Sequence, residues 1–106
     1  MAKYLIQASY TQQGLQGLLK EGGTSRRSTV EKLANGLGGN IDAFYYAFGD
    51  NDVYAIADMP DNATATAVAL TIGATGAVSL KTTVLITPET VDEAVKKTVD
   101  YRVPGA

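Results

Sequence analysis

The chain contains no cysteine and no histidine. The lack of cysteine excludes a disulfide framework, a thiol nucleophile and a thiolate metal site. The lack of histidine removes the side chain that most often changes its charge near pH 7. No serine stands in the Gly-x-Ser-x-Gly pattern of a hydrolase nucleophile. A hydrolytic or thiol enzyme would therefore have no ordinary base or nucleophile in this chain, and we expect no cofactor.

An excess of positive charge and a long apolar run are also missing. The formal net charge is −2, whereas a nucleic-acid surface needs a basic patch. No apolar stretch approaches the length that a bilayer-spanning helix needs. The first residues lead into a mixed polar and apolar strand pattern and not into the core of a signal peptide. We predict one cytoplasmic domain, residues 1–106, with no membrane or nucleic-acid partner.

The segment 43–61 has the clearest structural pattern. Two runs rich in aromatic and β-branched residues, 43–48 and 53–59, flank the polar residues 49–52. Aromatic and β-branched residues favour strands, while Gly, Asp and Asn favour tight turns. Pro60 lacks a backbone donor and ends the second run. The pattern predicts a β-hairpin that is followed directly by a capped helix.

The other elements are predicted from hydrophobic periodicity, helix caps and glycine breaks. Gly22 and Gly23 interrupt the first helical crossover, and a capping box at Ser28 predicts where its second half begins. The predicted elements are a strand at 3–10, an interrupted helix at 11–37 capped by Thr11, the hairpin strands, a helix at 62–74 capped by Asp61 or Asn62, a strand at 78–86 and a C-terminal helix at 88–100 capped by Thr87.

The predicted order is β-α-β-β-α-β with an added C-terminal helix. This order is typical of the α+β ferredoxin-like fold, which has a four-stranded antiparallel sheet. Two crossover helices cover only one face of such a sheet, and the other face would carry Tyr, Ala, Ile and Thr side chains. We expect a ligand or another copy of the chain to cover this second face, and we favour a homodimer or a higher oligomer.

The chain from Tyr4 to Ile86 resembles the GYD domain family. The resemblance is carried by Tyr10-Thr11-Gln12-Gln13-Gly14, Arg27, Leu37-Gly38-Gly39, Phe48-Gly49-Asp50-Asn51-Asp52, Asp58-Met59-Pro60-Asp61 and Gly76. The family is named for a Gly, Tyr, Asp signature; Gly49 and Asp52 match it, while Asn51 stands at the tyrosine position. The resemblance implies a dimeric α+β barrel, in which the open sheet faces of two chains pack together. Related barrel proteins include cofactor-independent monooxygenases, isomerases and ligand-binding regulators, so the resemblance leaves the activity open.

Arg27 and the carboxylates of the hairpin turn have alternative interpretations. Asp50 and Asp52 could form a cation site or an acid–base pair, but we favour a role in stabilising the turn and predict no metal. Arg27 lies in a stretch where a helix N-terminus would favour an anion. We favour the alternatives that it is an exposed charge in a flexible break or that it pairs with a carboxylate such as Asp50 or Asp52. Its place in the GYD pattern implies that it anchors the turn through Asp52.

Aromatic residues cluster on the predicted strands. Tyr45 points opposite to Tyr46 by alternation, so these rings cannot all line one pocket. Most of them are expected in a core or an interface, yet an aromatic cleft beside the inter-chain face is the best small-molecule site. We expect a planar aromatic compound to lie between Tyr46, Tyr54 and the partner chain. The candidate binding residues are Tyr10, Arg27, Tyr46, Asp52 and Tyr54.

Two functions fit the sequence. The one we favour is a non-enzymatic homo-oligomeric module that binds a small molecule. The alternative is a cofactor-independent enzyme of the barrel monooxygenase or isomerase type, which would use tyrosine, arginine or Asp52. The lack of histidine and of a strong polar cluster favours the module, and no catalytic residue is assigned.

Overall fold

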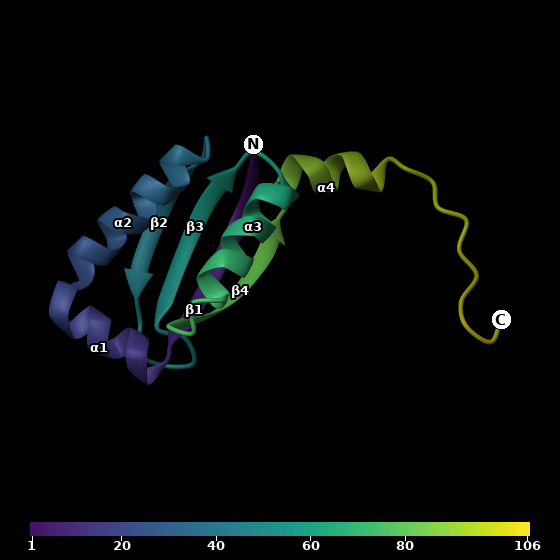
Figure 1. Ribbon diagram of the computed structural model, residues 1–106. Helices are drawn as coiled ribbons and strands as arrows, with labels where there is room; N and C mark the ends of the chain where they lie inside the picture. The colour runs from purple at the N-terminus through teal and green to yellow at the C-terminus, as the bar shows by residue number, and fades with distance from the viewer.

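The computed structural model describes the whole chain, residues 1–106, and has the predicted α+β ferredoxin-like architecture (Figure 1). The elements are β1 Ala2–Tyr10, α1 Gln12–Glu21, α2 Gly23–Gly36, β2 Asn40–Tyr46, β3 Val53–Met59, α3 Asn62–Gly73, β4 Val78–Leu85 and α4 Pro88–Val95. The four strands form one antiparallel sheet in the order β2-β3-β1-β4. None of the four helices is both long and apolar enough to cross a bilayer.

The helices α2 and α3 pack against the same face of the sheet. Ala34 of α2 and Ala65 of α3 belong to one buried cluster with Tyr4, Ala57 and Met59 of the sheet. On β3, alternate residues from 53 to 59 are buried, as expected of a strand with one face against helices. The alanines at positions 55 and 57 let the helices lie close to the sheet. The expectation that helices cover one face only is therefore confirmed.

The break between α1 and α2 needs only one residue, Gly22. Its φ of +81° lies in the left-handed region that favours glycine. The Gly22 carbonyl already accepts a hydrogen bond from the Arg26 N–H at 3.3 Å, so α2 begins at once. The predicted restart at Ser28 is wrong, because Ser28 lies inside α2 and no side chain caps this helix.

The last helix is shorter than predicted. Thr87 caps α4 and accepts a hydrogen bond from the Thr90 N–H, as expected, but the helix ends at Val95 and not at residue 100. No residue of α4 is buried, so no tertiary packing supports its continuation. The residues that follow include Thr98 and Val99, and β-branched side chains lower helix propensity. The chain beyond Val95 runs away from the sheet (Figure 1).

Candidate functional site: an apolar cleft between the helices and the sheet

An apolar cleft of about 430 Å³ lies between the helices and the sheet. α1 and α2 form one wall, α3 forms the other, and the helix-facing side of the sheet is the floor. Figure 1 shows these helices on either side of β3, which is seen between them. Of the 28 residues that line the cleft, 20 are hydrophobic. Sites for small molecules occupy roughly 300–1,000 Å³ and are mostly apolar, so this cleft has the size and the lining of one.

The cleft stays open because several residues facing it are very small. Gly17 of α1 and Ala69 of α3 line opposite walls. A Cβ at position 17 would meet no atom within 4 Å. Larger apolar side chains surround the space, among them Leu18 and Leu33 on one wall and Ile72 on the other. A side chain added at position 17 would therefore project into free volume.

One group of lining residues is polar and comes from the two consecutive helices α1 and α2. Gln13, Glu21, Arg26 and Thr29 belong to it. Arg26 Nη1 lies 3.4 Å from Glu21 Oε2, so these two charges pair with each other. The cleft thus combines an extended apolar surface with a few hydrogen-bonding groups, which can orient a ligand that has one polar group.

Tyr10 lines the cleft and Tyr46 lies next to it. The Tyr46 hydroxyl donates a hydrogen bond to the Gly23 carbonyl at 3.0 Å. Burial, with the neighbouring Tyr10 as a smaller cause, raises the pKa of Tyr46 to about 12. Its phenol is therefore protonated at neutral pH and is a hydrogen-bond donor, not a base.

The structure does not bring Tyr46 and Tyr54 to one site. Tyr46 pairs across the hairpin with the buried Val53, whereas Tyr54 pairs with Tyr45, whose exposure is 72 %. Cross-strand partners share a face, so the hairpin register places Tyr46 on the helix side and Tyr54 on the open side. The prediction that both hold one ligand is wrong. The predicted opposition of Tyr45 and Tyr46 is correct.

Asp52 fastens the hairpin turn to the end of β1. Its Oδ2 accepts a hydrogen bond from the Tyr10 N–H at 2.8 Å, and its own N–H donates to the Ala8 carbonyl at 2.8 Å. The adjacent Asn51 is 6 % exposed, and its amide group lies within hydrogen-bond distance of Ser9 and Tyr54. The turn-stabilising interpretation of Asp52 agrees with these contacts.

Arg27 does not pair with Asp52, so that prediction is wrong. It lies on the outer side of α2, where Arg27 Nε is 3.8 Å from Glu31 Oε1 and the side chain is 51 % exposed. The early start of α2 explains the difference, because it places Arg27 in the second turn of a helix and one residue after Arg26, which lines the cleft. An exposed pair of this kind contributes under about 1 kcal/mol.

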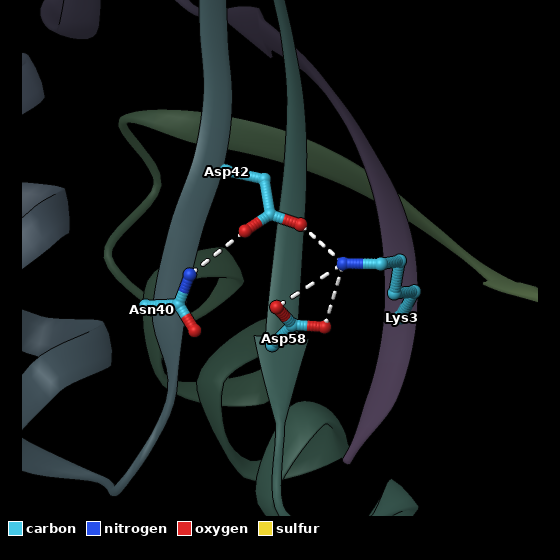
Figure 2. Close-up of polar contacts among 4 residues, drawn as sticks. All are labelled: Lys3, Asn40, Asp42 and Asp58. Atoms are coloured by element: carbon cyan, nitrogen blue, oxygen red, sulfur yellow. Dashed lines mark hydrogen bonds and ion pairs between the residues drawn. The ribbon is translucent and has the colours of Figure 1, made fainter.

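A charged cluster on the open face was not predicted from the sequence. Figure 2 shows Lys3 of β1 between Asp42 of β2 and Asp58 of β3, with Asn40 donating to Asp42. The Lys3 Nζ lies 3.0 Å from Asp58 Oδ1 and also bonds Asp42. A β-bulge between Ile41 and Ala43 leaves Asp42 without a partner on β3 and shifts the pairing with β3 by one residue. The bulge turns Asp42 toward Lys3. The cluster joins three strands, and no group of acidic side chains in the chain is arranged to hold a metal ion.

The charged cluster makes stability depend on pH in a defined way. Hydrogen bonding by Lys3 lowers the pKa of Asp42 below 3.8, so its stabilisation is lost as the pH falls through that lowered value. Hydrogen bonding by Asp42 and Asp58 raises the pKa of Lys3 above 10.5, so its stabilisation is lost as the pH rises through that raised value. We expect Lys3→Met to lower the urea midpoint most between these limits and least in strong acid. An equal loss at pH 7 and in strong acid would contradict a charge-based role.

Comparison with known proteins places these features in a family. A sequence model of the GYD domain matches residues 4–95. The match includes the whole hairpin, both walls of the cleft and the helix α4, whereas residues 96–106 lie outside it. No curated protein and no solved structure matches the chain.

Proposed function

The chain belongs to the GYD domain family, and we propose that it is a self-associating module that binds a planar, largely apolar small molecule in the cleft between its helices and its sheet. The observation that carries this proposal is the cleft itself, with its volume of about 430 Å³ and its predominance of hydrophobic lining residues. Burying apolar surface contributes about 25 cal/mol per Å², so the ligand would gain most of its affinity from the apolar walls and floor.

The composition of the cleft suggests how a ligand is oriented. Phe44 and Tyr10 supply aromatic surface, against which a planar ring can pack. The Gln13 amide makes no hydrogen bond within the chain, and the Thr29 hydroxyl, which donates to the Ser25 carbonyl at 3.1 Å, still has an oxygen that can accept, so both can serve one polar substituent. A molecule with an aromatic body and one hydroxyl or carbonyl group matches this arrangement.

The same residues support binding more than catalysis. Glu21 and Arg26 are paired with each other, and the raised pKa of Tyr46 keeps its phenol protonated at neutral pH. A general base must be deprotonated and within reach of the proton that it removes. Glu21 is the only carboxylate that lines the cleft, and Arg26 already holds it in an ion pair, so the monooxygenase- or isomerase-like alternative has less support.

Filling the cleft tests the ligand site. We expect Gly17→Leu to weaken binding of the naphthalene fluorophore 1-anilinonaphthalene-8-sulfonate at least tenfold, because the new side chain occupies the ligand volume. Fluorescence titration measures the change. Gly36→Leu is the matched control, since a Cβ at position 36 also meets no atom within 4 Å and Gly36 does not line the cleft. Equal affinities for the two variants would reject the cleft as the site.

Self-association is proposed for the open face of the sheet. Ile56 and Tyr54 on β3 and Leu5 on β1 are only partly covered, and Tyr45 is exposed. A second copy of the chain would bury these side chains, as the family resemblance implies. We expect light scattering to give a dimer for the native chain and a monomer for Ile56→Lys. Thr24→Lys on α2 is the control for the added charge, and an 11.1 kDa native species at micromolar concentration would contradict the proposal.

A further inference from the structure

The C-terminal arm, defined as residues 86–106, extends far from the rest of the molecule (Figure 1). The radius of gyration is 17.2 Å, whereas a compact chain of this length has about 13 Å. The arm is not a polar tail: Val99 and Tyr101 are 78 % and 69 % exposed, and no residue of α4 is buried. Exposed apolar side chains on a projecting segment indicate a surface that another molecule covers.

The arm contains a six-residue segment with the pattern of a strand. Residues 98–103 read Thr-Val-Asp-Tyr-Arg-Val. β-branched and aromatic residues dominate, and the apolar Val99, Tyr101 and Val103 alternate with the charged Asp100 and Arg102. No hydrogen bond is donated by the backbone N–H groups of residues 98–102. The segment therefore has strand character but no strand partner within the chain.

The sheet offers one edge that suits such a segment. β4 is an edge strand, and its pairing with β1 runs from residue 78 to residue 85 without a register shift. The other edge strand, β2, contains the bulge at Asp42. β4 has no proline, so its outer backbone groups can all pair with an added strand.

Side-chain alternation and charge match between the arm and β4. Val78 and Leu80 lie on the cleft side of β4, and Ser79 and Lys81 alternate with them. Lys81 is the only charged residue of β4, and it makes no ion pair. Asp100, the acidic residue of the strand-like segment, makes none either. Pairing the two segments brings apolar side chains together on one face and opposite charges together on the other.

We propose that residues 98–103 add as a fifth strand to the free edge of β4 in a second copy of the chain, with Asp100 beside Lys81. The inference rests on the proposed self-association. A second copy is the partner because the arm runs away from its own sheet (Figure 1), and because each copy would then give one arm and accept one. Such a two-fold exchange closes as a dimer.

A tryptophan in the arm reports its burial directly, because the native chain has none. We expect the emission of the full-length Tyr101→Trp chain to be blue-shifted at micromolar concentration. On dilution it should shift to the red together with the dimer-to-monomer change in light scattering. A water-exposed emission in a dimer would overturn the arm exchange and leave self-association through the sheet face intact. A blue shift that persists where light scattering shows a monomer would mean that the arm folds onto its own chain, and would also overturn the exchange.

Charge reversal tests the pairing of Lys81 with Asp100. In the same Tyr101→Trp chain, Lys81→Glu and Asp100→Lys should each weaken dimerisation on the order of fivefold, because like charges then face each other across the strands. The double variant should have a dimer dissociation constant within about twofold of that of the chain with Lys81 and Asp100 unchanged. Lys32→Glu and Asp92→Lys are controls with the same charge changes on α2 and α4. If the double variant does not recover its dimerisation, or if the controls weaken dimerisation equally, the contact between Lys81 and Asp100 is overturned. A monomer at all concentrations would overturn both the exchange and the self-association.

Discussion

Gly14→Ala is expected to destabilise the fold by roughly 2–3 kcal/mol or more, which is the cost of inserting a methyl group where backbone must move. A Cβ at position 14 would lie 2.1 Å from the carbonyl oxygen of Ala77 and 2.9 Å from the Tyr10 ring. The Ala77 carbonyl accepts hydrogen bonds from the Thr11 N–H at 3.0 Å and the Thr11 hydroxyl at 3.2 Å. Moving it would therefore break the attachment of α1 to the loop before β4. Urea unfolding measures the loss.

Gly17→Ala is the matched control for this prediction. It lies one turn further along the same helix, but a Cβ there meets no atom within 4 Å. Removing a glycine from a helix interior gains up to about 1 kcal/mol, so the two substitutions should have opposite signs. Equal urea midpoints for Gly14→Ala and Gly17→Ala would contradict the close approach of Ala77 to α1.

Tyr4→Ala is expected to cost about 3–5 kcal/mol, as for other large aromatic side chains in a core. Tyr4 is 1 % exposed and packs in the buried cluster with Ala34 and Met59, so its ring joins the sheet to the helices. The Tyr4 hydroxyl donates a hydrogen bond to Asn62 Oδ1 at 2.6 Å at the start of α3. Chemical denaturation of both Tyr4→Ala and Tyr4→Phe separates these contributions.

Tyr4→Phe keeps the ring and removes only the hydroxyl. We expect it to cost about 1 kcal/mol, the net contribution of one hydrogen bond. The difference between the two variants then measures the packing of the ring. A Tyr4→Ala loss no larger than the Tyr4→Phe loss would mean that this ring does not hold the sheet and helices together.

The fold could be predicted because its signals are local. The polar turn between two aromatic runs, the caps at Thr11, Asp61 and Thr87, and the double glycine all act over a few residues. The two wrong helix boundaries, the restart of α2 at Ser28 and the end of α4 at residue 100, have different causes, and the first hairpin strand, β2, lies at Asn40–Tyr46 and not at 43–48. In α2 one left-handed glycine is enough for the break, and in α4 no packing extends the helix.

The site was harder to predict, because it depends on contacts between distant segments. Tyr46 and Tyr54 were assigned to one site, since only the hairpin register decides which tyrosines share a face. The cleft depends on the spacing of helices across the sheet, which no sequence period encodes. The one feature of the sequence that could have indicated the cleft is the pair of glycines in α1, at positions 14 and 17. Lys3 reaches Asp42 only because a bulge turns that aspartate to the open face.

The ligand is proposed to bind between the helices and the sheet and not on the open face. Backbone amide NMR during titration with 1-anilinonaphthalene-8-sulfonate tests it most directly, because each face has its own reporter residues. We predict saturable changes in the amide chemical shifts of Leu18, Leu33 and Ile72, which line the cleft. Saturable changes in chemical shift confined to Tyr54 and Ile56 on the open face, with the signals of the cleft residues unchanged, would instead place the ligand on the open face and reject the cleft.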